Sequence, residues 1–211
     1  MSDCAECKVY ACVMARREAL PDNCPMVTTD LTDTREIYAD AKNREIARVS
    51  AIVEATGYVR WTRVEETMEF ARRLGFKKLG IAFCAGLREE GRLLERVLKS
   101  NGFEVVSAMC KTGAIPKEEI GIADSEKVRP GGFEAMCNPI GQARLLNDAG
   151  TDLNIMVGLC VGHDSLFIKY SDALVTCLVA KDRVMGHNPV AALYTSLGYY
   201  RKALYENHRP K

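Results

Sequence analysis

Four short apolar runs, each of strand length, constrain the possible fold more than any other feature of the chain. They are KLGIAFC at 78–84, FEVVSAMC at 103–110, LNIMVGLC at 153–160 and LVTCLVA at 174–180. Strands that read as continuous apolar runs are typical of parallel sheets that helices cover on both faces. The pattern predicts an α/β fold, a small doubly wound (Rossmann-like) parallel sheet of about four strands.

The segments before and between these runs have helical character. Apolar residues recur there at spacings near 3.6, and glycine or asparagine follows where the pattern stops. We expect helices at 30–56, 62–74, 86–101, 138–149, 164–171 and 189–205. The last of these is apolar and aromatic, so it is expected to pack back on the sheet. Residues 9–20 offer one further short helical possibility.

Three parts are expected along the chain. A length of 211 residues suits one medium domain with a small additional module. Residues 1–28 form a Cys-rich metal- or cluster-binding module, and residues 29–75 form a helical segment that packs on the core. Residues 76–211 form the α/β domain, with a crevice lined by cysteine and histidine.

Composition excludes several classes of protein. Twenty-nine Lys and Arg balance 28 Asp and Glu to a net charge of +1, which argues against a protein built to hold nucleic acid. The N-terminal sequence is acidic, and no stretch approaches the roughly 18–20 apolar residues of a membrane span. Phosphate-binding glycine motifs are missing. We therefore expect a soluble, cytoplasmic protein without a membrane or nucleic-acid partner.

Nine cysteines suggest metal binding or catalysis, because a reducing cytoplasm keeps thiols free. Four of them lie in the first 24 residues with the spacing Cys-x2-Cys-x4-Cys-x11-Cys, namely Cys4, Cys7, Cys12 and Cys24. Only sulfur ligands are offered, which suits an iron–sulfur cluster or zinc. The uneven run and the Pro25 that follows favour a cluster, such as 4Fe-4S, as a candidate. A zinc ion that staples the N-terminus remains the alternative.

The other cysteines follow the expected strands. Cys84, Cys110 and Cys160 end three of the apolar runs, and Cys137 precedes a helix cap. Carboxyl ends of parallel strands lie at one sheet edge, where open α/β domains bind ligands. These four cysteines are therefore expected to converge and to hold a second metal or cluster. Cys177 lies inside the fourth run and is interpreted as core packing.

Two histidines are expected at the same edge. His163 follows the third run, and His187 precedes the last helix. The catalytic candidates are Cys160, His163, His187 and Cys84. In a simpler arrangement, Cys160 or Cys84 is a nucleophile, and His163 or His187 is its base. The third histidine, His208, lies in a polar tail.

Three segments carry a resemblance to a known family. They are the N-terminal Cys-x2-Cys-x4-Cys, GLCVGHDSLF at 158–167 and VAKDRVMGHNPVAALY at 179–194. Over nearly the whole chain, the sequence resembles an uncharacterised family of bacterial and archaeal cysteine-rich metal-binding proteins. The resemblance implies no particular reaction, but it implies metal ligation by Cys4, Cys7, Cys12 and Cys24. In architecture alone, the chain is similar to hybrid-cluster proteins and carbon monoxide dehydrogenases, which are much larger.

The leading hypothesis is an iron–sulfur redox protein. Its N-terminal cluster would relay electrons to the second Cys/His site, where a small molecule reacts, as in a metal-dependent oxidoreductase. One alternative is a zinc-stapled module that binds or senses a small ligand. Another is a thiol-dependent sulfur transferase. The expected partners are a small-molecule substrate or an electron-transfer protein, and a homo-oligomer is compatible with the sequence.

Overall fold

The computed structural model describes residues 4–205, so His208 lies outside the described residues. The chain divides after Arg60 into two compact units. The sequence predicted a helical segment as far as residue 75, whereas the observed division falls earlier.

The first unit is helical, with short elements before one long helix. Its elements are two 3₁₀ turns (Ala11–Met14 and Arg17–Ala19), α1 (Pro25–Thr28), α2 (Asp33–Ala39) and α3 (Ala41–Gly57). The single helix predicted over 30–56 is wrong, because Asp40 leaves the helical conformation at φ −53° and ψ 133°. Its carboxylate accepts the N–H groups of Lys42 and Asn43 at 3.0 Å each, and so caps α3. The predicted helix at 9–20 is replaced by the two 3₁₀ turns.

The second unit begins with α4 (Arg63–Arg73). Thr62 and Glu65 form a reciprocal capping box that starts this helix, as the 62–74 pattern predicted. Met68 and Ala71 of α4 are buried in the same hydrophobic core as the sheet. The unit boundary therefore precedes α4.

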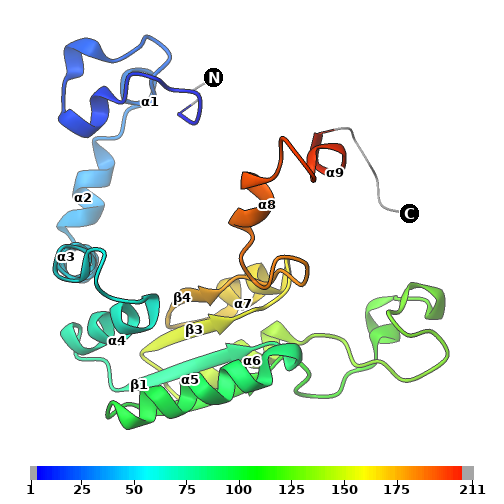
Figure 1. The fold of residues 1–211 in the computed structure, drawn as a ribbon. Coiled ribbons are helices and arrows are strands. Elements are labelled where there is room, and N and C mark those ends of the chain that lie inside the picture. Colours follow the sequence, from blue (N-terminus) through cyan, green and yellow to red (C-terminus); the bar gives the residue numbers. More distant parts are fainter. Residues whose placement is uncertain (1–3, 206–211) are drawn as a thin grey trace. The chain divides into compact units, whose positions relative to one another are not determined.

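Four parallel strands form the sheet (Figure 1). They are β1 (Lys78–Phe83), β2 (Glu104–Met109), β3 (Leu153–Val157) and β4 (Leu174–Val179), in the order β2-β1-β3-β4. The predicted α/β class is confirmed. Phe83 at the end of β1 is in register with Met109 of β2 and with Val157 of β3. The carboxyl ends of these three strands are therefore level with one another.

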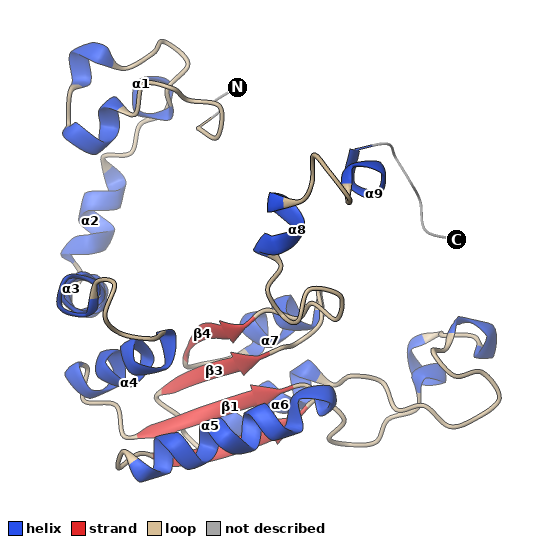
Figure 2. Ribbon diagram, viewed as in Figure 1, coloured by secondary structure: helices blue, strands red, loops and turns tan. Residues whose placement is uncertain are grey.

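Helices cover both faces of the sheet. They are α5 (Arg88–Ser100), α6 (Pro139–Asp148) and α7 (His163–Tyr170). Figure 2 shows α5 on one face and α6 and α7 on the other. Each has an apolar side in the core, with Leu98, Leu146 and Phe167 fully buried. No helix within residues 4–205 has the length and apolar composition needed to cross a membrane.

A buried polar network lies beside β1 and requires a glycine. Asn154 on β3 accepts the Thr151 hydroxyl at 2.8 Å and donates to the Ser171 hydroxyl at 2.6 Å. A Cβ on Gly80 would lie 2.0 Å from the Asn154 Oδ1 atom. The close approach of β1 to β3 therefore depends on the absence of a side chain at this position.

The edge strand and the C-terminal segment are more exposed than the sequence suggested. Cys177 on β4 is exposed, so the prediction that it packs in the core is wrong; β4 is an edge strand with one neighbour. The segment after residue 188 forms α8 (Val190–Tyr194) and α9 (Arg201–Tyr205), neither of which has a buried residue. Leu193 is 67% exposed and Tyr199 is 87% exposed. The single packed helix expected over 189–205 is therefore also wrong.

Candidate functional site

The carboxyl ends of β1 and β2 position two cysteines side by side. The N–H of Cys84 donates to the Val157 carbonyl at 3.1 Å, and the N–H of Cys110 donates to the Phe83 carbonyl at 2.9 Å. These bonds extend the parallel ladder by one residue beyond each strand. Cys84 and Cys110 are both buried at this edge. Their backbones are fixed by the sheet rather than by flexible loops.

A third cysteine arrives through the long excursion at 111–136. On its return, the N–H of Asn138 donates to the Cys110 carbonyl at 2.7 Å. Lys111 Nζ also donates to the Ala135 carbonyl at 2.5 Å, which ties the start of the excursion to its end. Cys137 is consequently held beside Cys110, although 26 residues separate the two in sequence.

The excursion itself is organised around a buried ammonium group. Lys127 Nζ lies 2.5 Å from a Glu118 carboxylate oxygen and 3.0 Å from one of Asp124, and donates to the Gly132 carbonyl at 2.9 Å. The side chain of Lys127 is only 4% exposed. Lys127 therefore links Glu118, Asp124 and Gly132, and its removal would leave these groups without their shared partner.

The thiols of Cys84, Cys110 and Cys137 form a hydrogen-bonded row with Cys110 in the centre. The N–H of Ala85 donates to the Cys110 sulfur at 3.3 Å. We call the four cysteines of this edge, Cys84, Cys110, Cys137 and Cys160, the thiol cluster.

Contact within the row separates the pKa values of its members. The neighbouring Cys137 and Cys84 sulfurs, together with burial, raise the pKa of the central Cys110 far above its usual range. The hydrogen bond from Cys110 lowers the pKa of Cys84 to about 4, with Gly86 N–H and Lys181 acting in the same direction against burial. A proton retained on Cys110 thus favours the thiolate form of the neighbour to which it is donated.

The other end of the row is also near cations. The hydrogen bond from Cys110 lowers the pKa of Cys137 to about 5, with Lys111 and His163 acting in the same direction. Burial of Cys137 opposes this lowering but does not overcome it. The contacts at both ends of the row therefore favour the thiolate form of Cys84 and Cys137.

Cys160 joins the cluster through an arginine. The residue follows β3, and Arg183 Nη2 donates to its sulfur at 3.1 Å. The thiolates of Cys84 and Cys137 also act on the Arg183 guanidinium, and the three sulfurs together raise its pKa. One cation therefore interacts electrostatically with three of the four cysteines.

The two candidate histidines have different surroundings. His163 begins α7, and its buried Nδ1 has no hydrogen-bond partner among the described residues. An electrostatic interaction with Cys137 places it near that end of the row. His187 instead accepts the N–H of Asp182 at its Nδ1, at 3.1 Å. This nitrogen is thus used within its own loop.

Two polar residues of the site were not identified from the sequence. Lys111 lies at the start of a long polar stretch, where a single lysine gives no distinct signal. Gln142 on α6 is fully buried, and its Nε2 donates to the carbonyls of Phe83 at 3.2 Å and Ala108 at 2.6 Å. It therefore braces the ends of β1 and β2 beneath Cys84 and Cys110. In the sequence, a glutamine on the apolar side of the predicted helix at 138–149 was the signal for the role of Gln142.

The N-terminal cysteines lie in the first unit. A turn brings the N–H of Cys7 to the Cys4 carbonyl at 3.3 Å. The N–H groups of Tyr10 and Val9 donate to the Cys7 sulfur and lower the pKa of this thiol. Cys4 and Cys12 are exposed, whereas Cys7 and Cys24 are half-buried.

Across residues 4–205, no three side chains of Cys, His, Asp or Glu are already arranged to hold a metal ion. All nine cysteines are free of disulfide bonds. The thiol cluster nevertheless offers a donor set of sulfur atoms only, and the pKa values of two of its thiols are lowered. Such a set suits soft metals and iron–sulfur clusters.

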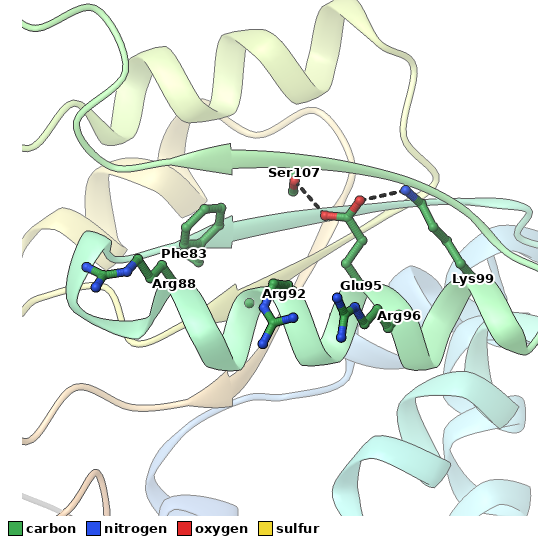
Figure 3. A pocket seen from close by; sticks show the side chains of 8 residues that line it. Phe83, Arg88, Arg92, Glu95, Arg96, Lys99 and Ser107 are labelled. Carbon is green, nitrogen blue, oxygen red and sulfur yellow. Dashed lines mark hydrogen bonds and ion pairs between the residues drawn. The ribbon is translucent and has the colours of Figure 1, made fainter.

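A separate groove of about 340 Å³ runs along α5 and β2 (Figure 3). Its lining contains no cysteine or histidine. Within it, the Glu95 carboxylate accepts the Ser107 hydroxyl at 2.9 Å and pairs with Lys99 at 2.6 Å. The groove thus contains its own ion pair and shares no sulfur with the thiol cluster.

Comparison with known proteins identifies relatives without an assigned activity. Residues 24–178 match a family described as "protein of unknown function (DUF1847)", so Cys4, Cys7 and Cys12 precede the matched region. An uncharacterized protein of Methanocaldococcus jannaschii is 51% identical over 171 residues, which cover 81% of this chain and 86% of that protein. The resemblance to an uncharacterised family is confirmed.

One solved structure is more distantly similar. It is a crystal structure of Dph2 from Pyrococcus horikoshii with a 4Fe-4S cluster, 19% identical, with a TM-score of 0.35. The match covers 67% of this chain but only 33% of that protein. A likeness this weak carries no argument about function.

Proposed function

The chain belongs to the DUF1847 family, and we propose that it is an iron–sulfur redox protein whose thiol cluster holds a cluster at which a small molecule reacts. The observation that most supports this proposal is the hydrogen-bonded row of Cys84, Cys110 and Cys137, to which Arg183 links Cys160. The four cysteines come from four separate segments at the carboxyl edge of the sheet, where open α/β domains bind ligands, and this supports the proposal.

The charges around the sulfurs support the proposal. Lys111, Lys181 and Arg183 each interact with a member of the thiol cluster. A cluster ligated by thiolates is anionic, and nearby cations and hydrogen bonds stabilise it and raise its reduction potential. The unpartnered Nδ1 of His163 fits as well, because a buried polar atom normally has a partner, which a bound group could supply here.

The residues of this chain have distinct roles in the proposal. An iron–sulfur cluster supplies one-electron transfer and, where an iron has an open position, a site for substrate. The lowered pKa values of Cys84 and Cys137 favour the deprotonated form that a metal ligand needs, whereas Cys110 would have to lose its proton on metal binding. Lys111, Lys181 and Arg183 favour anionic small molecules at the same edge. His163 is placed to hold or deliver a proton beside Cys137.

The N-terminal cysteines are proposed as a second cluster site that relays electrons. The turn at Cys4 and Cys7 and the N–H groups directed at the Cys7 sulfur are typical of metal-binding cysteine turns. An electron-transfer protein would then be the partner of the first unit. Zinc at these four cysteines is the alternative for this set.

Metal analysis of matched variants tests the proposal. Protein prepared anaerobically should contain iron and labile sulfide. Cys110→Ser should lose the share bound by the thiol cluster, because Cys110 contacts two of the other ligands. Cys177→Ser serves as the control, because Cys177 lies outside the cluster on β4 and should leave the metal content unchanged. Equal metal content in both variants would count against the proposed site.

The divergent pKa values favour one second candidate, a thiol-dependent sulfur transferase. A persulfide donor R–S–SH would pass its outer sulfur to the Cys84 thiolate, giving a Cys84 persulfide anion and the thiol R–SH. Mass spectrometry of iron-free protein after incubation with a persulfide donor tests this reaction. A gain of one sulfur on Cys84 supports transfer, and no gain on any cysteine of the thiol cluster rules it out.

A further inference from the structure

Strand β2 forms one edge of the sheet, and one side of its backbone is open. Among the described strands it pairs only with β1. The N–H groups of Glu104 and Cys110, at and just beyond its two ends, donate to the β1 side. Because backbone N–H groups alternate between the two sides of a strand, those of Val105, Ser107 and Met109 face away from β1. An open strand edge of this kind is a template for pairing with another chain.

A row of cations lines the groove between α5 and β2. Figure 3 shows these basic side chains on α5, in the order Arg88, Arg92, Arg96 and Lys99. Arg92 pairs with Glu89 at 2.6 Å. Arg88 and Arg96 are exposed and form no ion pair within residues 4–205. The groove therefore offers two guanidinium groups to an anionic partner.

The row of cations and the open strand have matching dimensions. At a rise of about 1.5 Å per residue, Arg88 and Lys99 lie about 16 Å apart along the axis of α5. The backbone of β2 from Glu104 to Met109 spans about 16 Å at roughly 3.3 Å per residue. Arg88 and Arg96 lie about 12 Å apart along the helix, close to the roughly 13 Å between same-face side chains four residues apart in an extended strand.

We propose that this groove docks an extended, acidic segment of a partner protein, which adds to β2 as a further strand and places carboxylates on the arginines of α5. The backbone of the segment pairs with the open side of β2, and its alternate side chains face α5. Carboxylates suit the row because the planar guanidinium group binds them in a bidentate manner. The proposal is independent of the thiol cluster and of any metal.

Two features of the groove favour a peptide over other anions. The lining contains four cations and one carboxylate, that of Glu95, which already accepts the Ser107 hydroxyl and pairs with Lys99. The lining is therefore cationic overall. A nucleic acid strand would use these cations but would leave the backbone of β2 unpaired, whereas an extended acidic peptide uses both.

A synthetic peptide of eight residues that alternates Glu and Thr is the probe, and fluorescence anisotropy with the full chain gives its Kd. Thr favours the extended conformation, and the alternation places every carboxylate on one face. The control peptide has four Glu followed by four Thr, with the same composition and charge. The alternating peptide should bind at least about fivefold more tightly, the difference expected when one or two surface ion pairs are lost.

Matched variants locate the site. Arg88→Gln with Arg96→Gln should weaken binding of the alternating peptide by at least about fivefold, because both unpaired cations of the row are removed. Arg144→Gln with Lys169→Gln removes the same charge from exposed positions on α6 and α7, which lie on the other face of the sheet. This control should leave the Kd unchanged. Far-UV circular dichroism checks that both double variants are folded.

N-methylation of the probe tests whether it binds as a strand. The N–H groups of the Glu residues and those of the Thr residues point to opposite sides of an extended peptide. Methylation of one of these two sets should abolish binding, and methylation of the other should be tolerated, because only one side pairs with β2.

Three outcomes would overturn the proposal. The first is equal affinity for the alternating and control peptides, or no binding of either, which would mean that the cations only protect the edge strand from unwanted pairing. The second is equal sensitivity of binding to the two methylated sets or to the two double variants. The third is an oligothymidylate of eight nucleotides that binds more tightly than the alternating peptide, which would assign the row to nucleic acid.

Discussion

Substitution of Cys110 by alanine should convert Cys84 from a thiolate into an ordinary thiol. The hydrogen bond from Cys110 is the largest cause of the Cys84 pKa of about 4. A thiol acid is ionised above its pKa, so the wild-type Cys84 thiolate persists from about pH 5 upward and is lost only as the pH falls through 4. Without Cys110, the pKa of Cys84 returns toward its usual value of about 8.5.

The magnitude follows from the ionised fractions. For wild-type Cys84, the ratio of alkylation rates at pH 8 and pH 6 should be about 1, because the thiolate is almost fully formed at both values. Full return to an ordinary pKa would raise the ratio to about 75 in the variant. Burial and the remaining contacts with Gly86 and Lys181 act in opposite directions, so we expect a ratio of at least about 10.

The assay is differential alkylation followed by peptide mass spectrometry on metal-free protein. Using a ratio within one cysteine cancels differences in access and in intrinsic nucleophilicity. Cys177 is the internal reference: partial desolvation of its sulfur on β4 raises its pKa, so its ratio should be near 100 in both proteins. A Cys84 ratio that stays near 1 in Cys110→Ala, or that is already near 75 in the wild type, would refute the reasoning.

Three further predictions address the fold and the division of the chain. Gly80→Ala should lower the free energy of unfolding of the second unit by about 2–3 kcal/mol, measured in urea. The added Cβ would lie 2.0 Å from Asn154 Oδ1 and 2.9 Å from a Leu146 methyl group. A change under about 0.5 kcal/mol would contradict this packing. Lys127→Met should speed hydrogen exchange in residues 112–136 by about tenfold while the strands stay protected, because the substitution removes the ammonium that Glu118 and Asp124 share. Uniform protection in that variant would show that the excursion is held by other contacts. Cys7→Ser should lower metal content yet leave the unfolding free energy of the second unit within about 0.5 kcal/mol, and global unfolding would mean that the two units are not separable.

The sheet and its cysteine-bearing edge were predictable from the sequence. Continuous apolar runs identify buried parallel strands, and a cysteine at the end of a run is then assigned to the carboxyl edge. The structure brings Cys84, Cys110 and Cys137 into contact by this route. The link between Cys160 and the other cysteines was not predictable in this way, because it runs through Arg183 on a loop distant in sequence.

Other features depended on information that periodicity does not carry. Asp40 interrupts an apolar pattern that continues through it, because a local side-chain cap competes with the helix. Cys177 was misassigned because strand order, which makes β4 an edge, cannot be read from hydrophobicity. The segment that ends at Tyr205 is apolar, yet its exposed side chains find no buried position within the described residues.

The roles of the polar side chains were the least accessible to sequence reasoning. Lys111 acts through a contact with the Ala135 carbonyl, and Gln142 through contacts with the strand ends at Phe83 and Ala108, all more than 20 residues away in sequence. Histidine often acts as a general base, but the direction of the His187 Nδ1 atom is set by the turn around Asp182. Such roles follow from geometry, which residue type alone does not determine.

The central claim is that the thiol cluster holds an iron–sulfur cluster. The most direct measurement is the iron and labile sulfide content, with an electron paramagnetic resonance spectrum after reduction, of anaerobically prepared protein. Wild-type protein should contain both elements in about equal amounts. Cys84→Ser should lose the iron and the labile sulfide that the thiol cluster binds. Cys177→Ser should lose neither. Stoichiometric zinc without sulfide, or a spectrum and metal content indifferent to Cys84, would contradict the account.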